Sequence, residues 1–188
     1  ENSGLDIQIG MLLAGPAVMM LFVVTLVSLL VHVYSTDYVA GDQRYTHFFA
    51  FLSLFTASML GLVIAKTTLQ LIVCWELVGV CSFVLIGHWW EEKANSDAAL
   101  KAFITNRVGD VGLIIGVILL FWTVGSFDIL ETNAAALDGS VGHSTLLIAS
   151  CCLIAAIMSK SGQFILHTWL PDAMAGPTPV SALIHAAT

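Results

Sequence analysis

Long apolar stretches dominate this sequence and restrict what it can fold into. A helix that spans a bilayer needs about 20 predominantly apolar residues, and five stretches meet that requirement. Of the 188 residues, 58% are hydrophobic and only 10% are charged, far from the balance of a soluble domain. The sequence therefore predicts an all-α, polytopic transmembrane helix bundle. The expected spans are residues 16–34, 48–65, 69–89, 102–124 and 146–166.

Residues 1–188 are expected to form one transmembrane domain that is part of a longer one. Residues 176–188 follow a proline-rich break and are apolar, but they are too short to cross by themselves, so we expect them to begin a sixth helix. Residues 127–137, within a polar loop, are expected to form a short surface helix. Gly109, Gly112 and Gly116 in the fourth span would let another helix approach closely.

The few basic residues predict the orientation of the chain in the membrane. Arg44 lies in the expected loop 35–47, and Lys93 and Lys101 lie in the expected loop 90–101. Because Lys and Arg are retained on the cytoplasmic side, both loops should be cytoplasmic. The sequence has no basic cluster, so we expect no nucleic-acid partner. The expected location is a membrane, crossed several times.

Two ionisable residues interrupt the apolar stretches. Glu76 lies near the centre of residues 69–89, and Lys160 lies within residues 146–166. A charge at the bilayer centre costs about 2.5 to 3.5 kcal/mol on insertion scales, so such residues usually mark ion or proton pathways. If Lys160 is the partner of Glu76, the pair can exchange protonation states. The alternatives are a structural glutamate, protonated or ion-paired, and a lysine that extends to the interface.

The sequence after Lys160 cannot continue as one helix. It passes through Gly162 and then Pro171, Pro177 and Pro179, and proline removes a backbone donor and clashes with the preceding turn. Irregular backbone at membrane depth is tolerated only where it is buried in protein or lines a wet cavity. We therefore expect a discontinuous helix beside Lys160. An ordinary loop at the membrane surface is the alternative.

Two further residues are candidates for proton movement. His185 lies six residues beyond Pro179, and its near-neutral reference pKa suits a proton relay, although an interior histidine can equally be structural. Asp110 lies three residues after Arg107, so the two can pair on one helix face. We expect Arg107 to stay near the cytoplasmic surface and Asp110 to bias the charge of Lys160 or Glu76 from a turn deeper. A purely structural pair is the alternative.

The sequence shows no pattern for a redox, nucleotide or metal site. It lacks a glycine-rich phosphate loop, the cysteine spacing of iron-sulfur proteins and paired histidines for haem. We therefore expect no cofactor in this chain, and we expect neighbouring subunits to drive any translocation.

Three motifs carry a resemblance to a known family. They are Cys-Trp-Glu-Leu-Val-Gly-Val-Cys-Ser at 74–82, Asn-Arg-Val-Gly-Asp at 106–110, and Ser-Lys-Ser at 159–161 continuing through His-Thr-Trp-Leu-Pro-Asp-Ala-Met at 167–174 to His-Ala-Ala-Thr at 185–188. Together they resemble the antiporter-like membrane subunit L, or subunit 5, of respiratory complex I, the NADH-quinone oxidoreductase. The resemblance covers nearly the whole chain and implies a fragment of the N-terminal half.

The resemblance implies a proton-translocating subunit driven by redox chemistry elsewhere. Glu76 would be the intramembrane glutamate, Lys160 the lysine of the broken helix, His185 the start of a relay, and Asp110 the residue that tunes this network. FMN, iron-sulfur clusters and quinone are expected in partner subunits. Expected partners are the other complex I membrane subunits, especially the adjacent antiporter-like subunit, together with the lipid bilayer and protons. The fragment would hold one half-channel.

Two other functions remain open at this stage. The chain could be the large subunit of a multisubunit Na+/H+ antiporter, although the Asn-Arg-Val-Gly-Asp element and the His-Ala-Ala-Thr segment favour subunit L. A structural scaffold is the third possibility. The bacterial plasma membrane is the expected location, otherwise an energy-transducing organelle membrane.

Overall fold

The computed structural model describes residues 8–187 and consists mainly of helices. Five of them are long and apolar enough to cross a membrane, and they are α1, α2, α3, α4 and α6. The predicted all-α, polytopic fold is therefore confirmed. The elements in chain order are α1 (Gly15–Tyr38), α2 (Tyr45–Val63), α3 (Thr68–Ile86), α4 (Lys93–Val124), α5 (Ile129–Leu137), α6 (His143–Lys160), the 3-10 helix η1 (Asp172–Ala175) and α7 (Thr178–Ala187).

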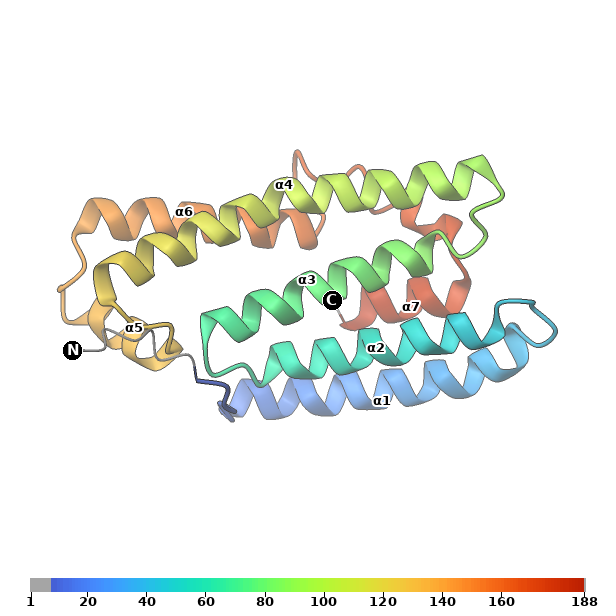
Figure 1. The fold of residues 1–188 in the computed structure, drawn as a ribbon, viewed down its shortest axis with the longest axis horizontal. Helices are drawn as coiled ribbons and strands as arrows, with labels where there is room; N and C mark the ends of the chain where they lie inside the picture. The colour runs from blue at the N-terminus through green and yellow to red at the C-terminus, as the bar shows by residue number, and fades with distance from the viewer. Residues whose placement is uncertain (1–7, 188) are drawn as a thin grey trace, which may run out of the picture.

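The long helices run side by side along one axis (Figure 1). α2 packs on α3, α3 on α4, and α4 on α6, while α7 lies against α1 and α3. The connections at 39–44 and 87–92 lie at one end of the bundle, and those at 64–67 and 125–142 lie at the other (Figure 1). The segments that carry Arg44 and Lys93 therefore share one end, as the charge pattern predicts.

Apolar side chains divide between an inner face and an outer face of each helix. Phe48, Leu52 and Phe55 follow the helical spacing along α2 and are fully buried. Phe22 and Trp122 are 67% and 85% exposed. Large apolar side chains pointing outward from helices of this length are expected of a protein surrounded by lipid.

Small residues allow α4 and α6 to pack closely. A Cβ atom on Gly112 would lie 2.6 Å from the carbonyl oxygen of Cys152, and one on Gly116 would lie 3.1 Å from that of Ala149. Only residues without a side chain allow backbones this near to each other. The predicted close approach of a helix along these glycines is confirmed, and α6 is the helix.

Helix α4 is longer than expected. It begins at Lys93, nine residues before the predicted start at 102, so most of the expected loop 90–101 is helical. Asn95 and Ala98 in this added segment and Ala102 directly after it are buried along one face, and their spacing of three and four residues is that of a helix stripe. The polar residues between them face outward and conceal the pattern in the sequence. The starts of α1, α2, α3 and α6 and the ends of α2 and α3 lie within three residues of their predicted positions. The end of α1 lies four residues later than predicted.

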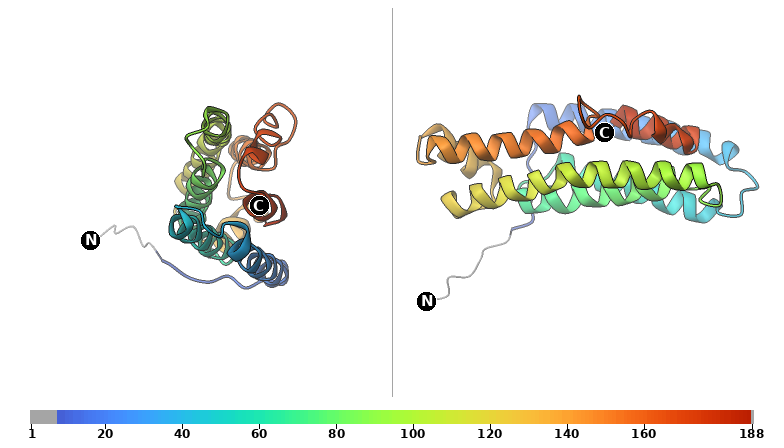
Figure 2. Two further views of the ribbon diagram at one scale, coloured as in Figure 1. Left: turned by 90° about the vertical axis from the view of Figure 1, so that its right-hand side faces the viewer. Right: turned by 90° about the horizontal axis from the view of Figure 1, so that it is seen from above.

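Helix α6 ends at Lys160, six residues before the predicted end at 166, and the break there is a glycine cap. Gly162 has φ +60°, and the N–H of Gln163 donates to the carbonyl of Met158 at 3.0 Å. This is the Schellman arrangement that terminates helices. Figures 1 and 2 show α6 ending about half-way along α4.

The chain beyond the break folds back onto the helix that it left. Trp169 is 4% exposed, and its indole N–H donates to the carbonyl of Ser159 at 2.9 Å. The same Ser159 carbonyl also accepts from the Gly162 N–H at 3.4 Å, so Trp169 packs directly on the cap that ends α6. The predicted discontinuous helix after Lys160 is therefore confirmed, with Gly162 rather than the prolines setting where it stops.

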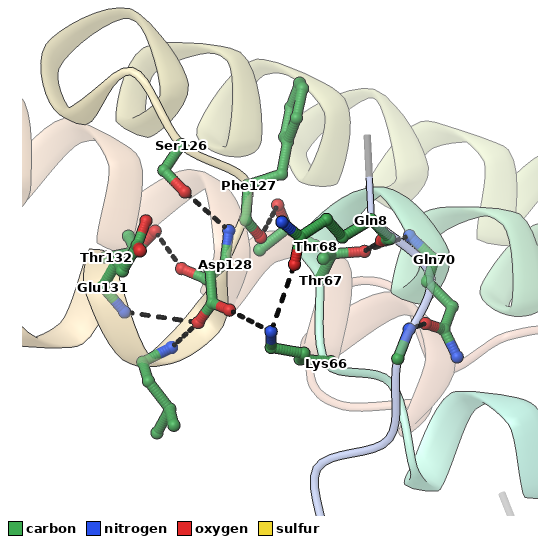
Figure 3. Close-up of polar contacts among 12 residues, drawn as sticks. Gln8, Lys66, Thr67, Thr68, Gln70, Ser126, Phe127, Asp128, Glu131 and Thr132 are labelled. Carbon is green, nitrogen blue, oxygen red and sulfur yellow. Dashed lines mark hydrogen bonds and ion pairs between the residues drawn. The ribbon is translucent and has the colours of Figure 1, made fainter. Parts of the chain in front are cut away.

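At one end of the bundle a polar lock joins the α2–α3 turn to the start of α5 (Figure 3). The Lys66 ammonium lies 3.3 Å from the Asp128 carboxylate, and the Thr68 N–H donates to the Phe127 carbonyl at 2.8 Å. Asp128 also caps α5 by accepting from the Leu130 N–H at 2.8 Å. Burial opposes ionisation of Asp128, but the Leu130 N–H and Lys66 outweigh it and lower its pKa. The predicted short helix at 127–137 is confirmed as α5.

A second group of polar contacts, the Asp42 and His88 lock, joins the connections at 39–44 and 87–92 at the opposite end of the bundle. His88 is fully buried, and its Nε2 lies 3.2 Å from the carboxylate of Asp42. Asp42 also accepts from the Arg44 backbone N–H, which is the main reason for its lowered pKa. Burial lowers the pKa of His88, opposed by its hydrogen bond and attraction to Asp42. Arg44 in turn ion-pairs with Glu91.

Candidate functional site

Four charged side chains gather where three helices of the bundle meet. Glu76 comes from the middle of α3, Arg107 and Asp110 come from α4, and Lys160 is the last residue of α6. The three helices meet because α4 packs on both α3 and α6. The structure thus brings together three of the four candidates, Glu76, Asp110 and Lys160, and adds an arginine.

Arg107 bridges the two carboxylates. Its Nη1 ion-pairs with Glu76 Oε2 on α3, and its Nε lies 3.6 Å from Asp110 Oδ2 one turn along α4. The pairing of Arg107 with Asp110 is as predicted. The sequence leaves open whether Glu76 and Lys160 touch, and among residues 8–187 no ion pair joins them. Glu76 pairs with Arg107 instead, whose side chain is 36% exposed. The long guanidinium side chain can contact both acids at once, and a lysine of another helix cannot compete with that geometry.

Asp110 is the most buried of the four, at 1% exposed. Its Oδ1 accepts a hydrogen bond of 2.6 Å from the indole N–H of Trp75. Its Oδ2 is buried without a hydrogen bond, so that Arg107 at 3.6 Å is the compensating charge. A buried carboxylate is stable only with such compensation, and removing a partner of a buried pair costs about 3 to 5 kcal/mol.

Lys160 reaches toward α3 from the end of α6. Its Nζ lies 5.5 Å from the centroid of the Trp75 ring, within the range of a cation–π contact. The residue is the last of α6, and its ammonium lies against the backbone of α3. Asp110 attracts this charge and Arg107 repels it. Lys160 is therefore in contact with the Trp75 ring and within the attraction of the Asp110 charge.

Gly79 makes room for both cations. A Cβ atom there would lie 3.0 Å from Lys160 Nζ and 3.6 Å from Arg107 Nη2. The absence of a side chain lets the two positive groups approach the backbone of α3 one turn after Glu76. Beside Lys160 is a cavity of about 200 Å³, which we name the lysine cavity. Its lining residues are Met59, Leu62, Trp75, Val78, Ile157, Lys160 and Ser161.

His185 lies apart from this cluster. It is on α7, which packs against α1 and α3, and its side chain is exposed. Among the described residues no hydrogen bond or ion pair joins it to Lys160. Its place in a relay stays a prediction.

Sequence reasoning missed Trp75 and Gly79. Both lie within three residues of Glu76 in the sequence, and Gly79 is one turn along the same face of α3. That spacing was the available signal. The spacing does not show on which side of α3 the end of α6 lies. That position depends on the glycines of α4 that contact α6.

The arrangement couples four charges that would sum to zero if all were ionised. Two acids and two bases share an interior with few hydrogen-bond donors, so a change in the charge of one group alters the stability of every other. A lysine at the end of a helix that stops inside the bundle, beside a cavity, is the setting in which ion-transporting membrane proteins place their sites. Fold and site thus define a polytopic membrane protein of the antiporter-like class.

Family models agree with this class and narrow it. Residues 65–188 match the model for "NADH:quinone oxidoreductase/Mrp antiporter, TM" and residues 1–49 match "NADH-Ubiquinone oxidoreductase (complex I), chain 5 N-terminus". The chain belongs to the NADH:quinone oxidoreductase/Mrp antiporter transmembrane family.

Curated relatives share about half of its residues. NAD(P)H-quinone oxidoreductase chain 5 of the cyanobacterium Synechocystis is 49% identical over 187 residues, covering 97% of this chain and 27% of the relative. Subunit 5 from the organellar chromatophore of Paulinella chromatophora is 51% identical over 173 residues, covering 90% and 26%. The chloroplastic subunit 5 of Angiopteris evecta is 50% identical over 191 residues, covering 100% and 25%. The chain therefore spans about a quarter of the length of these relatives.

A solved structure shares the fold. A chain of the Mrp complex from Dietzia sp. DQ12-45-1b superposes with a TM-score of 0.82 at 27% sequence identity, over 97% of this chain and 21% of that one. The resemblance to subunit 5 read from the motifs is thus confirmed, and the chain is a multi-pass membrane protein.

Proposed function

We propose that this chain forms a half-channel of a proton-translocating, antiporter-like subunit in a redox-driven NAD(P)H-quinone oxidoreductase. The observation that carries the proposal is Lys160 at the end of a helix that stops inside the bundle, in one cluster with Glu76, Arg107 and Asp110. An amine in that position can take up or release a proton when the balance of its neighbours changes.

In this mechanism Arg107 holds Glu76 in the observed state and leaves Lys160 to Asp110 and the Trp75 ring. A displacement of Arg107 would free Glu76 to attract Lys160, which strengthens the hold of the amine on its proton. If Arg107 then returned to Glu76, Lys160 would hold its proton less tightly and release it. His185 would receive the proton at the start of a path toward the remainder of the subunit. Asp110 tunes the cluster without carrying the proton.

The energy source would lie in other subunits. We propose that FMN, iron-sulfur clusters and quinone are bound by partner chains, that this chain carries no redox site, and that its neighbours include an adjacent antiporter-like membrane subunit. Names of the relatives support an oxidoreductase complex. The end that carries Arg44 and Lys93 would face the cytoplasm or its organellar equivalent.

The test is Lys160→Ala in the complete subunit within the assembled complex. We expect NADH-driven proton pumping to fall about tenfold or more while the complex still assembles, because an intramembrane ionisable group is lost. Lys93→Ala, at the exposed start of α4, is the matched control and should pump normally. Unchanged pumping by Lys160→Ala would leave only a scaffold role.

The second candidate is the large subunit of a sodium/proton antiporter, favoured by the structural match to an Mrp complex. Relatives near 50% identity carry oxidoreductase names, whereas the Mrp chain is 27% identical, which supports the first proposal. Sodium-dependent proton transport without NADH, by membranes that bear the subunit, would reverse this preference. Co-purification of flavin and iron-sulfur proteins would support the oxidoreductase.

A further inference from the structure

The Trp75 side chain lies between two partly open cavities beside the charged cluster. One is the lysine cavity. The other has a volume of about 310 Å³ and is walled mostly by apolar side chains of α3, α4 and α6, and we name it the α5 cavity. Its polar lining residues are Thr68, Thr132 and Asn133. Trp75 and Ile157 line both cavities, so these two side chains form the shared wall.

The α5 cavity leads from the end of the bundle toward the charged cluster. Thr68 is the first residue of α3, and Trp75 follows it by seven residues, or about 10 Å along the helix axis. Thr132 and Asn133 belong to α5, which lies at the same end of the bundle (Figure 1). Water that entered beside α5 would therefore have Trp75 and Ile157 between it and Lys160.

Two contacts that depend on charge hold the indole in place. Its N–H donates to the Asp110 carboxylate at 2.6 Å, and its ring face lies 5.5 Å from the Lys160 ammonium. A hydrogen bond to a carboxylate is roughly twice as strong as one to a neutral acceptor. A cation–π contact vanishes when the amine loses its proton. Neutralising either partner therefore loosens the ring.

We propose that Trp75 is a gate for water. While Asp110 and Lys160 are charged, the indole closes the passage between the α5 cavity and the lysine cavity. When Lys160 loses its proton, the cation–π contact is lost, the ring is released and water joins the two cavities. The inference rests on the proposed function, because it requires Lys160 to change its charge during turnover. Trp75 acts through the hydration of Lys160 and is a positioning residue.

The first experiment removes the ring in the assembled complex. Membrane vesicles that carry Trp75→Ala should show a severalfold higher passive proton leak without an electron donor, and fewer protons pumped per electron transferred. Trp122→Ala is the matched control, because Trp122 is 85% exposed on α4. A leak equal to that of the control would overturn the gate. If Trp75→Ala does not assemble, Trp75→Leu gives the same comparison.

A second measurement follows the water itself. Met59 lines the lysine cavity and is 7% exposed, so its oxidation by hydroxyl radicals reports water that enters there. We expect its oxidation to increase severalfold in Trp75→Ala and to stay at the wild-type level in Trp122→Ala. Trp75→Phe keeps the bulk of the ring and loses the indole N–H. It should shift the pH profile of pumping, which a purely space-filling role would leave in place.

The outcomes separate this inference from the proposed function. Normal pumping by Lys160→Ala would refute the proposed function. Loss of pumping in Lys160→Ala, with an unchanged leak and unchanged Met59 oxidation in Trp75→Ala, would refute the gate alone.

Discussion

At the scale of single residues, opposite charges and hydrogen-bond donors compensate the buried acids of the site. Arg107 contacts both acids, and the Trp75 indole occupies an oxygen of Asp110 that the arginine leaves free. Lys160 has no such fixed partner and is held by weaker contacts. The group with the weakest hold is the one whose charge is most easily changed, which is what a transported proton requires.

A substitution at Gly79 tests whether pumping depends on the distance of Lys160 and Arg107 from α3. Gly79→Ala would place a methyl group 3.0 Å from Lys160 Nζ, a separation tight enough to displace the ammonium. We expect pumping to fall several-fold while the subunit still assembles, since a flexible side chain can move aside. Gly15→Ala, with open space around it, is the control and should pump normally. Equal pumping by the two variants would show that the position of Lys160 is not critical.

The buried position of His88 leads us to expect that the folded protein loses stability at mildly acidic pH. Burial lowers its pKa in the folded protein, so the unfolded chain binds a proton more readily. The stability contributed by neutral His88 is complete above the unfolded pKa of about 6.5 and is lost as the pH falls toward the folded value. We expect the Tm to decrease between about pH 7.5 and about pH 5.5 and the decrease to be smaller in His88→Gln. Parallel pH curves for both proteins would contradict this.

Single residues also show where sequence reasoning reached its limit. Glu76, Asp110 and Lys160 stand out because ionisable groups are costly in a membrane span, and the structure gathers all three. Their pairing did not follow, because Arg107 was close enough in sequence to Asp110 to be read as its partner alone. Contact with Glu76 depends on how α3 and α4 are rotated against each other, and the apolar pattern of helices that are hydrophobic nearly all round does not encode that rotation.

At the scale of elements, apolar length predicts helices well and their ends less well. All five spans occur near their expected positions, because lipid forces backbone polar groups to bond within the helix. The start of α4 was missed because residues 93–101 are mostly polar and only their buried stripe is helical in pattern. The predicted end of α6 is too late because the apolar pattern continues to residue 166. The positive φ of Gly162 stops the helix earlier, and a sequence does not show which glycine adopts it.

The α5 cap offers a test at this scale. Asp128 caps α5 and also pairs with Lys66, so Asp128→Asn should keep most of the cap and lose the ion pair, whereas Asp128→Ala should lose both. We expect a cost of about 1 kcal/mol for loss of the cap, visible as faster proteolysis within residues 125–142. Because the pKa of Asp128 is lowered, its contribution is present at neutral pH and disappears as the pH falls through the folded pKa. Equal proteolysis of the two variants would argue that the cap adds nothing.

At the scale of the whole molecule, polar contacts join the helices at both ends of the bundle, and the Arg107–Glu76 ion pair joins α3 to α4 between them. The Lys66 and Asp128 lock closes one end, and the Asp42 and His88 lock closes the other (Figure 3 shows the first). Between them the chain from 161 to 171 runs without regular structure from the end of α6 to η1. Any motion that moves Lys160 relative to α4 is therefore expected to use this segment.

An exposed ion pair links η1, at the end of that segment, to α4, and its removal tests whether η1 restrains the segment. Lys101 Nζ lies 2.6 Å from Asp172 Oδ2, with both side chains more than 40% exposed at 45% and 43%. An exposed pair of this kind contributes about 0 to 1 kcal/mol, so Asp172→Asn should change the Tm little. We nevertheless expect faster hydrogen exchange across residues 161–177, because η1 loses its tie to α4. The charge swap, Lys101→Asp with Asp172→Lys, should restore slow exchange. Wild-type exchange in Asp172→Asn would mean that packing of Trp169 and Ala173 alone fixes the segment.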